Sequence, residues 1–381
     1  MITKTRDTSN VVAIRRVVDI AKKIDVLEPD SAPLVQLTKK IQKKVAINPE
    51  FHWMEEEALV KNDQINHAAG YTSGDVSVTV DHGEYFRAGD VVKDVTTGEQ
   101  FLVSAVTTND LTISRGWGST SATTISDDDY LLIVGNANAE GATKRGIKIA
   151  DQSPKMNYTQ IFRTPFGITR TADKSEMYGG SDLAHQRMIQ LIEHQKEIER
   201  AFWFGEPKED TSIADHPTRA TGGVDYFLST YASGMSGTMT EAEFEAFLRD
   251  GFRYGSKTKW LFAAPIYLSA INFWAKSALF VAPSDKTFGI DVRQWLTPFG
   301  MVNIVLCNLF AETTTYAGYA YLIDIDGLQY RYLTDSDTKL KTNIQANDAD
   351  GEEDEYISEI GLALSQEKKD ALAYGTTSFS A

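Results

Sequence analysis

Apolar residues recur at helical spacing near the start of the chain. Two stripes run through residues 11–27, one formed by Val11, Ile14, Val18 and Ala21 and the other by Val17, Ile20, Ile24 and Leu27. The run Glu28-Pro29-Asp30 interrupts this pattern. Ser31 then suits an N-cap and Pro33 suits a first helical turn. We therefore expect a second helix with a stripe of Leu34, Leu37, Ile41 and Val45.

A different pattern fills residues 74–136, where short runs of β-forming residues alternate with turn-rich pieces. The runs are residues 76–80, 91–92, 100–106, 111–113 and 130–134. Short strands at this spacing predict a small β-barrel or sandwich. Helical patterns lie on both sides of it, so we interpret it as an inserted module.

The longest helical pattern begins after Ser181, an expected N-cap, and ends at Gly205. Its stripe consists of Ala184, Met188, Leu191, Gln195, Ile198 and Phe202. About 24 residues rising 1.5 Å each give a helix of roughly 36 Å. The stripe could form a coiled-coil seam, but we prefer a face that packs on the sheet of its own domain.

The second half of the chain mixes helical and strand patterns. Thr240 and Glu243 form a capping box before a helix that ends near Gly255, and Pro265 opens another helix that runs to residue 278. Residues 260–264 and 301–306 are expected strands. Asp326-Gly327 lies between two apolar runs, 321–325 and 328–333, and predicts a β-hairpin. The class that we expect is α+β.

Composition excludes several classes of protein. The 381 residues are 42% hydrophobic, enough for a sizeable core, and carry a net charge of −15, which disfavours wrapping of nucleic acid. The single cysteine, Cys307, cannot form an intrachain disulfide and is expected to be a buried thiol. There is no secretory signal and no run of about 18 apolar residues, so we expect no membrane association.

The charge is unevenly distributed. Residues 1–50 carry a net charge of +4 and the remainder carries −19. A basic arm on an acidic body can dock on another copy of that body or on another acidic partner, although the same residues could simply be solvated helix faces. The candidates for intersubunit contact are Arg15, Arg16, Lys22, Lys23, Lys39, Lys40, Lys43 and Lys44.

No catalytic or cofactor motif is present. The six histidines form no zinc-binding helix, and His185 and His194 fall on nearly opposite sides of the long helix. Residues 348–355 have a partial likeness to a calcium loop, but we prefer a solvated acidic loop because two ligand positions are missing. Asn157-Tyr158-Thr159 matches a glycosylation sequon, which we interpret as chance. We predict no catalytic residue, no cofactor and no metal site, and hence a structural protein.

The order of these segments resembles that of a tailed-bacteriophage major capsid protein with the Hong Kong 97-type fold. Several ordered stretches are similar to its SU-ten-type branch. They are Ser31-Ala32-Pro33-Leu34, residues 48–53, Phe86-Arg87-Ala88-Gly89-Asp90, Arg115-Gly116-Trp117-Gly118, residues 139–142, residues 157–162, residues 198–205, Thr221-Gly222-Gly223 and residues 359–363. They cover nearly the whole chain.

The resemblance implies that successive parts of the chain form different domains of a capsid subunit. Residues 1–50 would be an N-terminal arm that reaches over neighbouring subunits, and 51–150 an extended loop carrying the β module at about 74–136. Residues 151–221 and 336–381 would form a peripheral domain with a spine helix at about 181–204, and 222–335 an axial domain.

The resemblance also implies a function. The chain would self-assemble into hexamers and pentamers of an icosahedral shell in the virion, formed in the host cytoplasm, that encloses double-stranded DNA without reading its sequence. Scaffold and portal proteins, and a decoration protein, are the implied partners. Some relatives lock the shell with a Lys–Asn crosslink, but no residue here can be assigned those roles, so we predict none.

Three other classes compete with this hypothesis. One is the shell protein of an encapsulin-like nanocompartment, which shares the fold but usually lacks a large β insertion. Another is an acidic carbohydrate-active or carbohydrate-binding protein. The last is another virion part, such as a tail tube or decoration protein.

Overall fold

The computed structural model describes residues 32–41, 43–175, 181–212, 216–235, 237–274, 282–287 and 290–380. The chain divides into two compact units. Unit 1 combines Met1–Trp53 with Lys155–Ala381, and unit 2 is Met54–Pro154. The helix expected in residues 11–27 lies outside the described residues.

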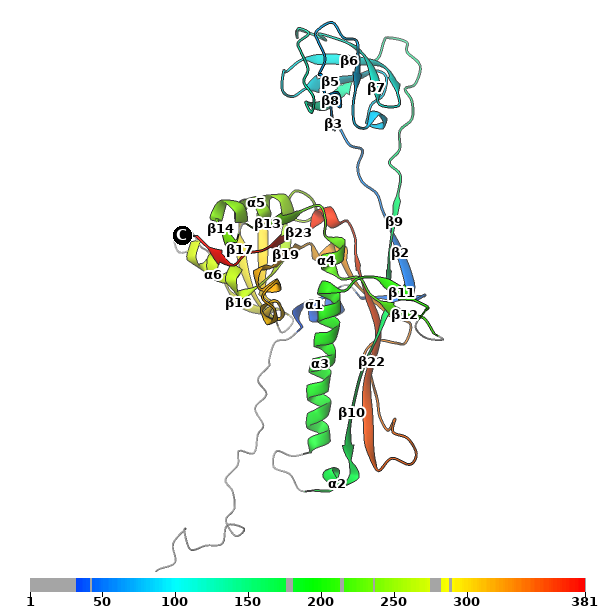
Figure 1. Ribbon diagram of the computed structural model, residues 1–381, viewed down its shortest axis with the longest axis vertical. Helices are drawn as coiled ribbons and strands as arrows, with labels where there is room; N and C mark the ends of the chain where they lie inside the picture. The colour runs from blue at the N-terminus through cyan, green and yellow to red at the C-terminus, as the bar shows by residue number, and fades with distance from the viewer. Residues whose placement is uncertain are drawn as a thin grey trace, which may run out of the picture. The chain divides into compact units, whose positions relative to one another are not determined.

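Unit 2 is a six-stranded β module (Figure 1). Its strands are β3 (Asn62–Gln64), β4 (Ser77–Thr79), β5 (Asp90–Asp94), β6 (Gln100–Thr107), β7 (Asp110–Ser114) and β8 (Tyr130–Asn136). Their spatial order is β3-β8-β5-β6-β7-β4, and an isolated bridge between Ile65 and Val80 joins the two outer edges. The sheet therefore closes into a small barrel. All five predicted strand runs are confirmed, whereas β3 was not predicted.

The barrel has its own apolar core. Every second residue of β5 is buried, as the strand period requires. The buried apolar side chains are Ile65, Val78, Val80, Phe86, Val92, Phe101, Val103, Leu111, Ile113, Ile125 and Leu131. Because these residues come from all the strands after β3, the module can bury a core without help from unit 1.

Unit 1 contains a five-stranded sheet in the order β1-β20-β22-β10, with β21 also paired to β22. The strands are β1 (Lys43–Ala46), β10 (Gln160–Thr169), β20 (Leu328–Leu333), β21 (Lys339–Lys341) and β22 (Gly351–Leu364). β10 and β22 pair over ten residues as a long antiparallel ladder. The helix α3 (Asp182–Phe204) lies against both strands (Figure 1).

A seven-stranded sheet forms the second layer of unit 1, in the order β13-β23-β19-β15-β18-β17-β16. Its strands are β13 (Ala232–Gly234), β15 (Thr258–Ala263), β16 (Ala282–Thr287), β17 (Ile290–Leu296), β18 (Met301–Leu306), β19 (Ala320–Ile323) and β23 (Ala371–Tyr374). The helices α5 (Glu241–Gly251) and α6 (Pro265–Trp274) contact it through β23 and β15. The predicted capping box of Thr240 and Glu243 is confirmed.

Short elements complete unit 1. They are α1 (Pro33–Ile41), α2 (Arg170–Asp173), α4 (Val224–Phe227) and the strand pairs β2 (Glu50–Glu55) with β9 (Ser153–Tyr158), β11 (Lys208–Asp210) with β12 (Thr218–Ala220), and β14 (Thr238–Met239) with β24 (Ser378–Phe379). No helix among the described residues is both long and apolar enough to cross a membrane.

The long helix is confirmed, with Ser181 as its N-cap residue. Its predicted stripe is buried only in the second half: Ile198 and Phe202 are fully buried, whereas Met188 is 50% exposed. Trp203, outside the stripe, is also fully buried and packs edge-on against Phe262 and Phe310 of the adjoining layer. The same-domain packing that we preferred therefore describes the C-terminal half of the helix.

Two local predictions are wrong. The runs 321–325 and 328–333 do not form a hairpin, because β19 joins the seven-stranded sheet and β20 joins the five-stranded sheet. Between them lies a 3₁₀ turn, Ile325–Gly327, capped by the side chain of Asp324. Val45 is not helical either: α1 ends at Ile41, and Val45 lies in β1 paired with Tyr332.

Candidate assembly site

The helix α1 is anchored to α3 by a buried carboxylate. Glu199 of α3 accepts hydrogen bonds from the backbone N–H groups of Leu34 (3.0 Å) and Val35 (2.8 Å). It also accepts one from Trp203 Nε1 at 2.9 Å. The first N–H groups of a helix have no partner within it and carry a partial positive charge, so a carboxylate is a suitable acceptor. The N-terminal segment is therefore attached to unit 1 at a defined point.

Burial dominates the electrostatics of this anchor. It raises the pKa of Glu199 from 4.5 to about 7, while the N–H groups of Val35, Trp203 and Leu34 act in the opposite direction. Cys307, whose predicted burial is confirmed, has a pKa well above its ordinary value for the same reason. The attachment of α1 is consequently sensitive to the protonation of Glu199.

Two of the candidate lysines bind within their own subunit. Lys39 donates to Thr338 Oγ1 at 3.0 Å, and its ammonium lies 5.4 Å from the ring centre of Tyr330. Lys43 forms an ion pair with Asp337 and lies 4.8 Å from the ring centre of Tyr332. Burial lowers the pKa of Lys39. These two side chains join α1 and β1 to β20 and to the residues that follow it.

The other candidates are placed differently. Lys40 and Lys44 are exposed, the latter in β1 opposite Arg331. Arg15, Arg16, Lys22 and Lys23 lie outside the described residues. The intersubunit role of all eight candidates, Lys39 and Lys43 included, stays a prediction.

Four of the stretches that carry the resemblance converge on one buried position in unit 1. Asn157 accepts from the backbone N–H of Gly222 at 2.7 Å and donates to the carbonyls of Gly222 (2.9 Å) and Leu362 (2.6 Å). Thr221 Oγ1 accepts from the N–H of Leu362 at 3.3 Å. Gly223 donates to the carbonyl of Gly205, the residue that ends α3, at 2.8 Å. We call Asn157, Gly205, Thr221, Gly222, Gly223 and Leu362 the junction.

The junction is closely packed around Gly223. A Cβ atom at Gly223 would lie 2.8 Å from the carbonyl oxygens of Ala201 and Phe202, closer than any Cβ contact tolerates. Asn157 is fully buried, which agrees with our interpretation of its sequon as chance. The junction thus fixes how β9, α3, α4 and β22 meet.

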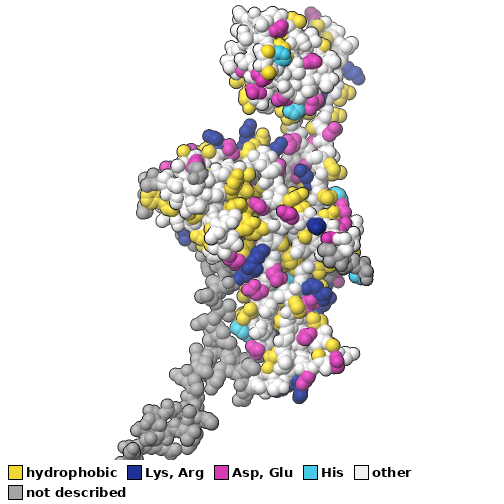
Figure 2. All heavy atoms as spheres, viewed as in Figure 1, with side chains coloured by type: hydrophobic (Ala, Val, Ile, Leu, Met, Phe, Trp, Pro, Cys, Tyr) yellow, Lys and Arg dark blue, Asp and Glu magenta, His cyan; other side chains and the backbone are white. Residues whose placement is uncertain are grey.

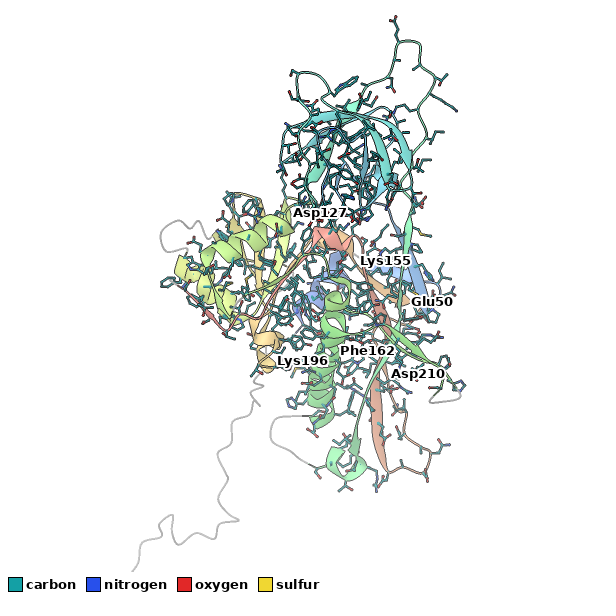
Figure 3. The ribbon with its side chains drawn as sticks, turned by 45° about the horizontal axis from the view of Figure 1, so that its top comes forward. Glu50, Asp127, Lys155, Phe162, Lys196 and Asp210 are labelled. Atoms are coloured by element: carbon teal, nitrogen blue, oxygen red, sulfur yellow. The ribbon has the colours of Figure 1, made fainter. Side chains whose placement is uncertain are left out.

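A buried polar chain runs through the sheet beside the anchor. His194 bonds to Thr164 at 2.8 Å and to Ser358 at 2.7 Å, and Ser358 donates to Thr338, the acceptor of Lys39. Burial, together with the charge of Lys39, lowers the pKa of His194 to about 4. Phe162 of β10 lies beside α3, with its ring edge-on to His194 at 6.5 Å (Figure 3). His194 is therefore a packed neutral histidine.

The acidic stretch at 348–355 is largely strand rather than loop. Arg187 bonds to Asp354 Oδ2 at 2.8 Å and to Glu352 at 3.1 Å, and Arg163 binds both oxygens of Glu355 at 2.6 and 2.8 Å. Basic and acidic side chains are interspersed over this part of unit 1 (Figure 2). The carboxylates of β22 serve as partners for arginines, so the expected solvated acidic loop is wrong for residues 351–355.

In unit 2, the Arg115-Gly116-Trp117-Gly118 stretch contains a buried ion pair. The guanidinium of Arg115 donates to both oxygens of Glu99 at 2.7 Å, and the two side chains are 7% and 0% exposed. Glu99 also accepts from the N–H groups of Gly116 (3.1 Å) and Thr123 (2.9 Å). Gly116 has a φ of 61°, a conformation suited to glycine. The pair fixes a loop that leaves Trp117 38% exposed.

Sequence reasoning missed the central residues of both sites. Glu199 and Asn157 are single polar residues, and the contacts that make them anchor points join positions at least 65 apart along the chain. The signal in the sequence was the resemblance of the stretches 157–162 and 198–205 to capsid proteins, which did not single out these two residues.

Solved structures share the arrangement of elements described above. The chain is similar to the structure titled Mycobacterium phage Ogopogo, with a TM-score of 0.52 and 10% identity over 97% of this chain and 99% of that one. For Mycobacterium phage Bobi the TM-score is 0.51 with 8% identity over 98% and 99%. For the capsid of a native GTA particle it is 0.50 with 7% identity over 96% of each chain. The fold is therefore that of phage capsid proteins.

Sequence comparison identifies the family. The SU10 major capsid protein family matches residues 1–377, and the chain belongs to it. The major capsid protein of Pseudomonas phage PaMx41 is 23% identical over 247 residues, which cover 61% of this chain and 59% of that protein. The chain is thus a member of a major capsid protein family, and the match spans about 59% of the length of the curated relative. The family indicates a structural role and is that of major capsid proteins rather than of the alternative classes considered above.

Proposed function

We propose that copies of this chain assemble into hexamers and pentamers of an icosahedral shell that encloses double-stranded DNA. Assembly takes place in the host cytoplasm with scaffold and portal proteins, and a decoration protein is a further partner. The chain acts by binding other copies of itself, with no catalytic activity, cofactor or covalent crosslink.

The two-stranded ribbon β2–β9 carries this proposal. A two-stranded ribbon is at best marginally stable in water without a further strand or a packed face. Large apolar side chains on and beside it are exposed in the single chain: Met54 is 65%, Met156 46% and Ile161 56% exposed. Apolar surface of this kind marks a contact with another protein. One face of the ribbon is covered within the chain, where Phe51 packs with Ala46 and Ala363. A neighbouring copy covers the opposite, exposed face in the shell.

The charge distribution supports attraction between copies. The N-terminal 50 residues carry +4 and the remainder −19, so the arm of one copy is attracted to the body of another. Lys40 and Lys44, together with Arg15, Arg16, Lys22 and Lys23, supply the intersubunit contacts. Such attraction weakens as salt shortens the Debye length. The acidic body also leaves enclosed DNA mobile, because it offers few partners for phosphate.

The sheet membership of the strands suggests the limits of the domains. We propose that the axial domain is the seven-stranded sheet with α5 and α6, and that the peripheral domain is the five-stranded sheet with α3. On this assignment β20, within residues 222–335, goes to the peripheral domain, and β23, within residues 336–381, goes to the axial domain. Residues 1–50 form the arm and residues 51–150 the extended loop.

Light scattering and negative-stain electron microscopy of the purified full-length chain test the proposal. We expect closed shells, sheets, hexamers or pentamers, either from the chain alone or after addition of the cognate scaffold and portal. A chain that remains monomeric with both partners present would contradict it.

A charge-reversal variant tests the arm separately. Replacing Arg15 and Arg16 by Glu should lower the salt concentration at which assemblies dissociate. The control is Lys208→Glu, an exposed lysine of β11 whose Nζ lies 3.6 Å from Asp210. Equal salt sensitivity of the two variants would refute the electrostatic role of the arm.

A further inference from the structure

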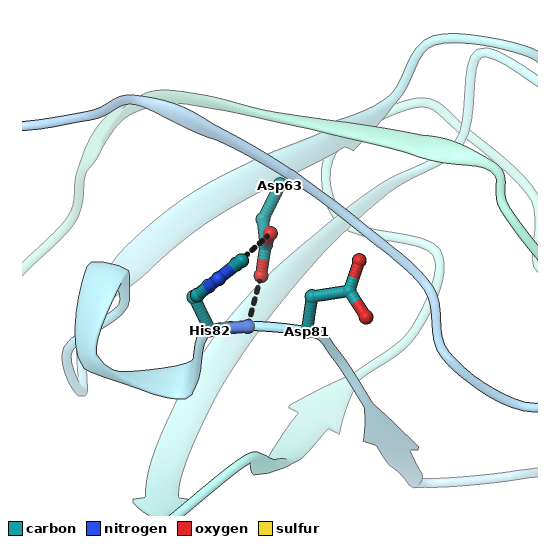
Figure 4. Close-up of side chains that lie close together, drawn as sticks. All are labelled: Asp63, Asp81 and His82. Carbon is teal, nitrogen blue, oxygen red and sulfur yellow. Dashed lines mark hydrogen bonds and ion pairs between the residues drawn. The ribbon is translucent and has the colours of Figure 1, made fainter.

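The closing edge of the barrel in unit 2 brings three metal-ligating side chains together (Figure 4). Asp63 lies in β3, and Asp81 and His82 directly follow the segment that contains β4. One ligand atom of each residue lies within 4.8 Å of the other two. His82 Nδ1 is 3.1 Å from Asp63 Oδ1.

These residues lie where the barrel is least continuous. The outer strands β3 and β4 are joined by a single bridge, Ile65 to Val80, rather than by a ladder. Two flanking backbone hydrogen bonds reinforce it, Asn66 N–H to the Thr79 carbonyl at 3.0 Å and Asp81 N–H to the Gln64 carbonyl at 3.2 Å. A ligand shared by Asp63 and His82 would therefore connect the two edges.

The local charge favours a cation. Asp63 is only 7% exposed, and its one ion-pair partner within the described part of the chain is the His82 ring. Asp81 accepts a hydrogen bond from the neutral amide of Asn66 at 2.7 Å, and no lysine or arginine pairs with either carboxylate among the described residues. Asp63 Oδ2 accepts a hydrogen bond from the backbone N–H of His82 at 2.7 Å and Oδ1 faces the His82 ring, so both oxygens have partners. No permanent positive charge balances this carboxylate, and a bound cation would supply one.

We propose that Asp63, Asp81 and His82 bind a divalent first-row transition ion that links the edges of the barrel. Imidazole with carboxylates is a ligand set suited to Zn²⁺ and its neighbours, whereas Ca²⁺ and Mg²⁺ prefer oxygen alone. The side chain of His82 is 52% exposed, so water can complete the coordination. The ion has a structural role, in addition to the shell function of the chain.

Calorimetric titration of the chelator-treated full-length chain with Zn²⁺ tests this site. We expect one site per chain that His82→Ala and Asp81→Asn each weaken by about 10-fold or more. Asn at position 81 retains an oxygen for the Asn66 amide, so this variant remains informative if His82→Ala does not fold. The matched control is His67→Ala, because His67 lies in the same unit and stacks on Tyr71, outside the cluster.

Hydrogen exchange gives the second readout. At Zn²⁺ concentrations about 100 times the dissociation constant, exchange of the Asn66 and Asp81 amides should slow by up to about 100-fold, because the ion binds only the closed edge. Three results would overturn the proposal: no Zn²⁺ binding by the native chain, equal binding by native chain and His82→Ala, or a preference for Ca²⁺ over Zn²⁺.

Discussion

Replacement of Glu199 by Gln should loosen α1 without unfolding unit 1. In the native chain the two carboxylate oxygens accept three N–H groups: Oε1 from Leu34 and Trp203, and Oε2 from Val35. Gln keeps one oxygen for the first two donors. It then places its own NH₂ group against the N–H of Val35, so one buried donor loses its acceptor.

The size of the effect follows from that count. An unsatisfied buried donor costs about 1–3 kcal/mol. Since about 1.4 kcal/mol corresponds to a factor of ten, the opening equilibrium of α1 should rise roughly 5- to 150-fold. The apolar contacts of Leu34, Val35 and Leu37, all buried, keep the helix docked most of the time.

Amide hydrogen exchange of the full-length chain at pH 5, where the raised pKa keeps Glu199 mostly neutral, measures this opening without the added effect of removing a buried charge. Exchange in residues 34–41 should accelerate, while exchange in the β module stays unchanged. Glu197→Gln is the control, because Glu197 is exposed on the same helix and bonds to Thr164 rather than to α1. Native exchange rates of α1 in Glu199→Gln would refute the anchor.

Three further predictions concern pH, packing and the module. The pKa of Glu199 is raised by burial from 4.5 to about 7, so its contribution to stability is complete below pH 4.5 and is lost as pH rises through about 7. The denaturation midpoint of the native chain should fall over that window relative to Glu199→Gln. Gly223→Ala should lower the unfolding free energy of unit 1 by about 1–3 kcal/mol or more, measured by urea denaturation. Arg115→Met should cost unit 2 about 3–5 kcal/mol, because Glu99 would be left buried without its partner.

A separate result would contradict each of these three predictions. A stability difference between native chain and Glu199→Gln that does not change from pH 4.5 to 8 would show that Glu199 does not titrate there. Gly135→Ala, where a Cβ atom meets nothing within 4 Å, should be nearly neutral, and an equal loss in both glycine variants would contradict the packing argument. Arg170→Met removes an ion pair with side chains 69% and 63% exposed, and should cost less than about 1 kcal/mol.

The sequence pattern was sufficient to predict those helices and strands whose formation depends mainly on neighbouring residues. The barrel strands β4 to β8 and the helix α3 follow from alternation and helical spacing, which depend only on neighbouring residues. The strand β3 was not predicted because Asn62-Asp63-Gln64 contains no apolar residue. Its pairing with β8 depends on a strand about 70 positions later, which no local pattern reveals.

The Asp326-Gly327 prediction was wrong for a related reason. A two-residue hairpin turn needs positive φ at these positions, and neither residue has it. Instead Asp324 caps the intervening turn, and each run finds its partners in a different sheet. The apolar runs were correctly predicted as strands, but their choice of neighbours is decided by tertiary packing.

The contacts of the anchor and junction could not be predicted from one sequence. Glu199 pairs with residues 164 and 165 positions away, and Asn157 pairs with Leu362 across 205 positions. The stretches that contain them were predicted to matter through their resemblance to capsid proteins, but only the fold shows that they meet.

The order of strands has a consequence for synthesis of the chain. β22 lies between β20 and β10 in one sheet, and β23 lies between β13 and β19 in the other, so both sheets of unit 1 lack an interior strand until residues 351–374 have been made. The strands of unit 2, in contrast, all lie between residues 62 and 136 and can pair early. A nascent chain can therefore contain a folded β module before the two sheets of unit 1 can be completed.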